Sequence, residues 1–136
     1  MDSHFFPTLS PDAIDLSQVA EHRVGDAGSP AIVAKRSSYP NRHHIGPHWH
    51  SRAQFMYAVA GTMRVRAPRR VWIIPPSRAL WVPPHTVHEL QMYGVVEMRS
   101  LYVNDDWAAG MPASCVVLNV TGLLRELVLR AVTLPV

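Results

Sequence analysis

The stretch HWHSRAQFMYAVAGTMRVR, residues 48–66, decides the fold class. It begins with two histidines and a glutamine, continues as an apolar run and, after Gly61, alternates polar with apolar residues. Such alternation is typical of a half-buried strand, and a glycine between two strand-like runs predicts a tight turn or a bulge. His48, His50 and Gln54 are two and four positions apart, so they share one face of an extended segment. The stretch predicts β-strands with a polar cluster on one face.

The chain on both sides of this stretch has the same β character. Its twelve prolines, among 136 residues, stand between apolar runs, which favours short strands joined by turns over a helical bundle. Further strands are expected at residues 31–34, 71–74, 79–82, 87–92, 95–103 and 115–118. Many short strands at this spacing predict a sandwich or a barrel. We therefore expect a mainly β domain over residues 31–118.

The two ends of the chain differ from this β region. Residues 1–30 are expected to be an N-terminal leader, with a short helix over Ala13–Glu21. Residues 119–136 are expected to be a C-terminal helix that Thr121 caps. This helix either pairs with a second chain or packs on its own barrel. Its apolar residues at helical spacing are Leu123, Leu124, Leu127 and Val128.

Composition excludes several classes of protein. With 48% hydrophobic and 17% charged residues the chain is a folded globular protein, not a disordered one. A net charge of +3 does not indicate nucleic-acid binding by this segment alone. The single cysteine, Cys115, excludes a disulfide framework and is expected to be a buried thiol. No signal peptide and no apolar stretch of ~20 residues is found, so we expect a cytoplasmic protein.

A second inward histidine position lies further along the chain. His88 shares its parity with Leu90 and Met92 and is therefore expected to point toward the barrel interior. Together with His48 and His50 it could form a three-histidine metal site, because imidazoles at alternate positions can converge on one ion. Gln54 would supply an oxygen. The alternative is a polar pocket without a metal.

These residues match the motifs of a known superfamily. The spacing H-x-H-x-x-x-Q-x-x-x-x-x-x-G, from His48 to Gly61, resembles the first cupin motif, which has Glu where this chain has Gln54. The segment PPHTVH, ending at His88, resembles the second motif, with His85 in place of the usual glycine. The resemblance implies a double-stranded β-helix (jelly-roll) barrel whose metal ligands are His48, His50, Gln54 and His88.

A longer resemblance covers most of the chain. The runs RAQFMYAVAGTMRV, PPSRALWVPPHTVHEL, VEMRSLYV and VTGLLRELVLRAV occur in the order seen in the N-terminal sensor half of AraC-type transcription regulators. That resemblance implies a barrel that binds a small-molecule effector, a helix that forms a homodimer, and DNA binding through a C-terminal domain absent from this chain. About a hundred further residues with two helix-turn-helix units would then follow.

The resemblance and the residue parity together give a set of candidate contacts. The metal is expected to be divalent: zinc, nickel, iron or manganese. Effector contacts are expected from inward or aromatic residues, namely Met56, Trp72, Trp81 and Tyr102. The alternative function is a small metal-dependent cupin enzyme, an oxygenase or an isomerase, but no clear acid–base partner accompanies the histidines. We therefore expect a sensor without catalytic residues.

Overall fold

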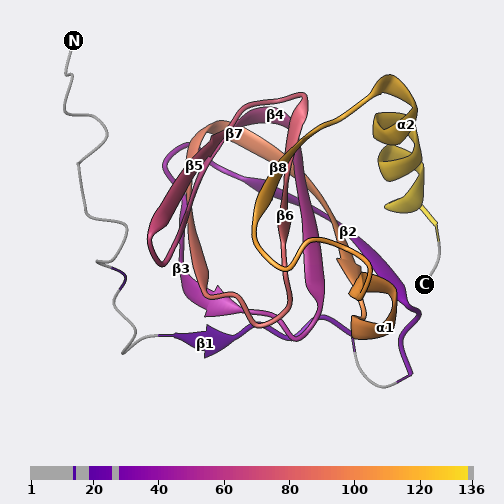
Figure 1. Ribbon diagram of the computed structural model, residues 1–136. Coiled ribbons are helices and arrows are strands. Elements are labelled where there is room, and N and C mark those ends of the chain that lie inside the picture. Colours follow the sequence, from indigo (N-terminus) through magenta and orange to yellow (C-terminus); the bar gives the residue numbers. More distant parts are fainter. Residues whose placement is uncertain (1–13, 15–18, 26–27, 135–136) are drawn as a thin grey trace, which may run out of the picture.

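The computed structural model describes residues 14, 19–25 and 28–134, which fold into a β-barrel with a helix beside it (Figure 1). Within these residues the helices are α1 (Asp105–Ala108) and α2 (Gly122–Ala131). The strands are β1 (Ala20–Glu21), β2 (Ile32–Tyr39), β3 (His44–Trp49), β4 (Ala53–Ala67), β5 (Arg70–Ile74), β6 (Arg78–Val82), β7 (His88–Val103) and β8 (Val116–Asn119). The predicted mainly β jelly-roll fold is confirmed.

The two longest strands, β4 and β7, form the centre of the sheet. They pair antiparallel along most of their length, while β2 and β3 also pair with β7, and β5 and β6 with β4. The remaining two described strands, β1 and β8, pair with β3 and β6. This arrangement brings the inward residues of β3, β4 and β7 to one end of the barrel.

A glycine bulge bends β4. Gly61 has a φ of +79°, and a Cβ at that position would lie 2.5 Å from the carbonyl oxygen of Val95. The pairing of β4 with β7 shifts register on both sides of Ala60, so the bulge alternative at Gly61 is correct. The expected break between two strands at Tyr93 and Gly94 is wrong, because β7 is a single strand from His88 to Val103. Gly94 has a φ of +75° and bends the strand without ending it.

The strands separate two apolar clusters. Inward side chains of β4, β5, β6 and β7 fill the barrel, among them Met56, Leu80 and Met92. Outward side chains of β4 and β6 form a second cluster, which is closed by Ala108 and by Val128 of α2. The C-terminal segment therefore covers the outer face of the sheet that also lines the barrel.

Local hydrogen bonds explain where the helices begin. The Thr121 hydroxyl accepts a hydrogen bond from the amide of Leu124 at 3.2 Å, as predicted for the cap of α2. The short α1 was not predicted, and the Asn104 side chain caps it. The predicted helix over Ala13–Glu21 is wrong at Ala20–Glu21, which pair with β3 as β1, and most of its remaining length lies outside the described residues. No helix of the described residues is long and apolar enough to cross a membrane.

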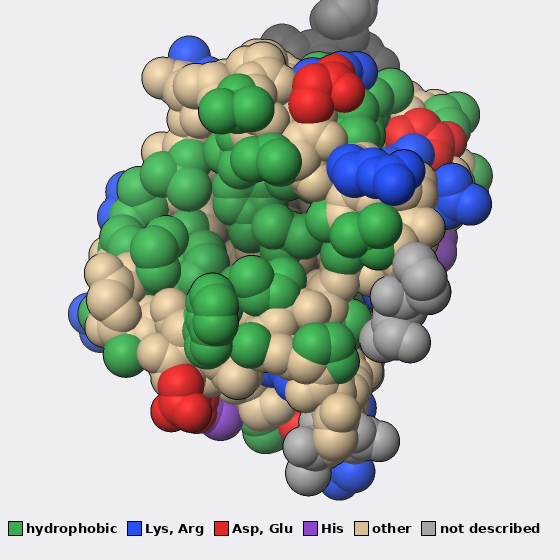
Figure 2. Space-filling model, turned by 90° about the vertical axis from the view of Figure 1, so that its right-hand side faces the viewer, with side chains coloured by type: hydrophobic (Ala, Val, Ile, Leu, Met, Phe, Trp, Pro, Cys, Tyr) green, Lys and Arg blue, Asp and Glu red, His purple; other side chains and the backbone are tan. Residues whose placement is uncertain are grey.

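The apolar residues of α2 fall on two faces. Leu124 and Val128 pack in the outer cluster, whereas Leu123 and Leu127 are 73% and 59% exposed. Figure 2 shows hydrophobic side chains gathered around a hollow on the side of the molecule that carries α2. The helix therefore packs on its own barrel with one face and leaves the other uncovered.

Candidate functional site

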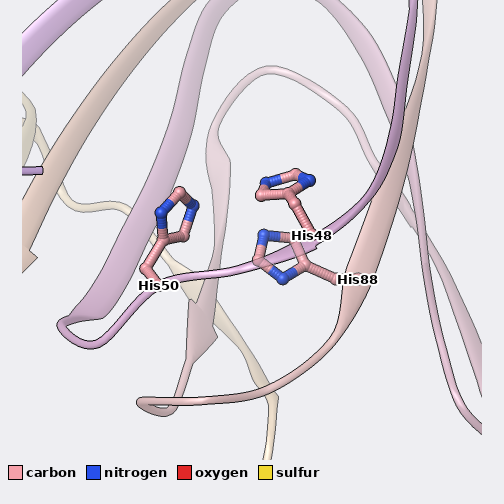
Figure 3. Close-up of side chains that lie close together, drawn as sticks. All are labelled: His48, His50 and His88. Carbon is pink, nitrogen blue, oxygen red and sulfur yellow. The ribbon is translucent and has the colours of Figure 1, made fainter. Parts of the chain in front are cut away.

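Three histidines meet inside one end of the barrel. His48 comes from β3, His50 follows that strand, and His88 begins β7 directly opposite His48 in the register. Their side chains are at most 6% exposed, and one ligand atom of each lies within 4.8 Å of the others. Figure 3 shows the three rings turned toward a common space. The structure thus brings together the three histidines predicted from residue parity.

Backbone carbonyls fix the tautomer of each histidine. Each Nδ1 lies 2.7–2.8 Å from a carbonyl oxygen. Because a carbonyl only accepts, Nδ1 carries the proton and the lone pair of Nε2 is free for a ligand. Nε2 of His88 is buried without a hydrogen-bond partner. The three carbonyls belong to Gly46, His22 and Thr86.

Burial keeps the three imidazoles neutral. It lowers the pKa of His48 to about 3 and that of His88 to about 4, and it also lowers the pKa of His50. A neutral imidazole is the form that coordinates a metal, whereas an imidazolium has no free lone pair. At neutral pH all three Nε2 atoms are therefore available as ligands.

Gln54 lines the same cavity as His48 and His50. Its Nε2 donates to the hydroxyls of Ser100 and Tyr102, both at 3.1 Å, while Oε1 is buried without a partner. Burial raises the pKa of Tyr102 to about 12, so this hydroxyl stays protonated. Three imidazole nitrogens and an unpartnered amide oxygen suit a divalent transition metal such as zinc, nickel, iron or manganese. Within the described residues, the donor set fits the predicted metal.

A cavity of about 90 Å³ opens beside the histidines. Tyr102 lines it, as predicted for an effector contact, together with Gln54, His48 and His50. Among the described residues that line it there is no aspartate or glutamate. The remaining lining residues are His22, Arg23, Val24, Lys35, Tyr39, Ile45, Leu90 and Met98.

Three other candidate effector contacts lie elsewhere. Met56 is fully buried in the cluster that fills the barrel, and Trp72 packs against the same cluster beneath the Arg70 side chain. Trp81 lies in the outer cluster, where its indole Nε1 donates to the carbonyl of Pro112 at 3.0 Å. None of the three lines the described cavity, and their contact with an effector stays a prediction.

Two residues that line the cavity, His22 and Lys35, were not among the predicted contacts. The ring of His22, beyond β1, stacks on His48 with centroids 4.2 Å apart, and its carbonyl accepts from His50. Lys35 of β2 is paired with Ser100 across the sheet, which puts both on the inward face. Lys35 and Tyr39 are an even number of positions apart, so strand parity places them on the same face and could have identified Lys35. No pattern in residues 1–30 indicated His22.

His85 occupies the position that is glycine in the second cupin motif. Its φ is +64°, in the left-handed region that favours glycine. Its amide donates to the carbonyl of His50 at 2.8 Å, and its ring lies 5.4 Å from that of Trp49. These contacts hold the loop before His88 against the loop that carries His50, so the backbone shape of the motif is kept although its glycine is not.

Glu89, the residue after His88, is buried beside two basic side chains. It is 6% exposed and forms an ion pair with Arg66, while Nε2 of His44 lies 3.3 Å from its other oxygen. Glu89 and Arg66 are paired across β7 and β4, on the face opposite the histidines. Arg66 is itself buried at 9% exposure, and its charge is compensated by Glu89.

The sequence matches the family described as AraC-like ligand binding domain over residues 29–132, which is most of the chain. The chain belongs to this family. It is 30% identical over 82 residues to the HTH-type transcriptional regulator NimR of Escherichia coli strain K12. That alignment covers 60% of this chain but only 30% of NimR, so the chain spans about a third of this relative.

Solved structures share the fold. ToxT of Vibrio cholerae O395, solved with (E)-4-(8-methylnaphthalen-1-yl)but-3-enoic acid, superposes with a TM-score of 0.62 at 5% identity. The match covers 76% of this chain and 48% of ToxT. A cupin superfamily protein of Desulfitobacterium hafniense DCB-2 superposes with a TM-score of 0.54 at 16% identity, over 58% of this chain and 72% of that one. At these identities the likeness establishes the cupin fold alone.

Proposed function

We propose that this chain is the effector-sensing and dimerisation part of an AraC-type transcription regulator, and that its barrel holds a divalent transition metal. The family match supports the sensor role, and NimR supports the regulatory context. The observation that carries the metal is the set of three buried histidines whose Nδ1 atoms are all engaged and whose Nε2 atoms face one another. His48, His50 and His88 would hold the ion, with Gln54 beside them.

The effector would bind in the cavity beside the metal. Tyr102 and Gln54 line this cavity and are hydrogen-bonded to each other, so a ligand that touches either one acts on both central strands. In ToxT the corresponding fold was solved with a small organic molecule bound. A bound effector would then favour one arrangement of barrel and α2 over another, provided that it binds the two arrangements with different affinity.

The exposed face of α2 is the proposed contact with a second copy. Leu123 and Leu127 are one helical turn apart, and both are exposed. DNA would be bound by a C-terminal domain that lies outside residues 1–136, and the regulator would act in the cytoplasm. An open reading frame that continues after Val136 with two helix-turn-helix units supports this assignment, and a stop codon contradicts it.

Metal analysis of the purified chain tests the centre of the proposal. We expect close to one zinc, nickel, iron or manganese ion per chain, and we expect the double substitution His48→Ala and His50→Ala to remove it. His43→Ala is the matched control, because His43 is exposed and stacks on Tyr39 outside the histidine cluster. Absence of metal, together with no thermal stabilisation by added ions, would leave only the metal-free pocket.

The alternative, a metal-dependent cupin enzyme, has less support from the described residues. Neither nearby glutamate on β7 serves the cavity: Glu89 pairs with Arg66, and Glu97 accepts from Ser38 and does not line it. Tyr102 holds its proton too firmly to act as a base at neutral pH. The cavity therefore offers ligands and hydrogen-bond donors rather than a general acid or base.

A further inference from the structure

The histidine site has no charge of its own with which to balance a divalent ion. Imidazoles that bind a metal are neutral, and Gln54 is a neutral amide where the cupin motif has a carboxylate. If a dication binds there, as proposed above, its double positive charge stays uncompensated by these ligands. A compensating anion must then come from another lining residue or from the ligand, because an unbalanced charge in a buried site is costly.

The other residues that line the cavity do not provide that anion. Arg23 is 3.9 Å from Glu21, so these two charges offset each other at the rim. Lys35 is solvent-exposed and lines the cavity, and it takes part in none of the ion pairs found among the described residues. Lys35 is the register partner of Ser100, whose hydroxyl accepts a hydrogen bond from Gln54, so the lysine lies on the same face of the sheet as the amide.

The shape of the cavity limits the ligand further. Ile45, Leu90 and Met98 give one part of its wall an apolar character, while Tyr39 and Tyr102 bring hydroxyl groups. The space of about 90 Å³ beside the histidines holds a group of a few non-hydrogen atoms, such as a carboxylate. An organic acid with a short carbon body satisfies both the charge and the apolar wall, whereas a phosphate leaves the apolar wall unmatched.

We propose that this cavity is a receptor for a small carboxylate, whose charge is matched by Lys35 and by the dication that the histidines hold. Gln54 is the residue that makes this possible, because it places an oxygen in the site without adding a negative charge. The proposal rests on the metal-binding function above and adds the chemical class of the effector. It assigns Lys35 and Gln54 as specificity residues rather than as structural ones.

The test is a calorimetric titration of the zinc-loaded chain with propionate, propionamide and inorganic phosphate in a buffer free of carboxylates. Propionate is expected to bind at least about tenfold more tightly than propionamide, since hydrogen bonds to charged groups are the stronger ones. Lys35→Met should weaken propionate about tenfold or more and leave the zinc content unchanged. Arg36→Met is the matched control, because this neighbour has the opposite parity on β2 and does not line the cavity.

Gln54→Glu separates the two proposals. An added carboxylate should tighten zinc but weaken propionate by about tenfold, because it supplies the charge that the ligand otherwise brings. Equal affinity for propionate and propionamide, tighter binding of phosphate, or no effect of Lys35→Met would each overturn the carboxylate receptor while zinc binding stands. Failure of the wild-type chain to bind zinc or another divalent ion overturns both proposals.

Discussion

The two faces of β4 and β7 have opposite properties although they are one residue apart. On the inner face Gln54 and Tyr102 are opposite each other and hydrogen-bonded, beside buried acceptors that have no partner. On the outer face the next pair along, Phe55 and Leu101, is apolar and belongs to the cluster beneath α2. The alternation of side chains along a strand places a polar binding site and a dry helix-packing surface on the same two strands.

Because the inner and outer faces belong to the same two strands, a ligand in the barrel can act on α2 outside it. A ligand that shifts Gln54 or Tyr102 must also move their neighbours, because adjacent residues share the backbone. Those neighbours pack with Val128 in the outer cluster, and closely packed side chains transmit small displacements. Under the proposed function, a ligand would contact the inner face of β4 and β7, and the resulting shift would reach α2 through the outer face of the same two strands.

Placing a charge at Val128 should give the largest effect. Val128 is 1% exposed, so Val128→Asp puts an uncompensated charge into the outer cluster and should lower the free energy of unfolding by about 3–5 kcal/mol. Leu127→Asp, at the exposed neighbour, should change it by about 0.5 kcal/mol at most but should weaken self-association. Urea denaturation measures the free energy of unfolding of each variant, and light scattering measures its self-association. Equal destabilisation by both variants would contradict the assignment of the two helix faces.

How much of this could be read from the sequence differs between the faces. The polar cluster of the inner face was predictable from parity, since His48, His50 and Gln54 stand at even offsets and therefore share one face of a strand. The continuity of β7 through Gly94 could not be predicted from the sequence. A glycine favours a turn in the local sequence, and only pairing with distant strands decides whether the strand continues. The division of the α2 residues also depends on tertiary contacts, and helical spacing alone did not separate Leu123 from Leu124.

Acidification should destabilise the metal-free chain through its inner face. The pKa of His48 is lowered to about 3 and that of His88 to about 4, against an ordinary value of 6.5. Below pH 6.5 the unfolded chain therefore binds protons that the folded chain does not, and stability falls until the folded pKa values are reached. We expect a loss on the order of 5 kcal/mol between pH 6.5 and pH 4, roughly half from each histidine, measured by urea denaturation. His48→Gln should make this slope shallower, and an unchanged slope would show that His48 does not contribute.

Two tyrosines give the finest comparison of the faces. Tyr102 accepts a hydrogen bond from Gln54 on the inner face, whereas the hydroxyl of Tyr57, on the outer face, makes no hydrogen bond within the described part of the chain. Tyr102→Phe should lower the free energy of unfolding by about 1 kcal/mol and weaken metal binding about tenfold, because the amide that holds Oε1 in place loses one of its two partners. Tyr57→Phe should leave metal affinity unchanged. A competition titration with a zinc-binding dye distinguishes the two variants, and an equal affinity in both would mean that Gln54 does not depend on Tyr102 for its position.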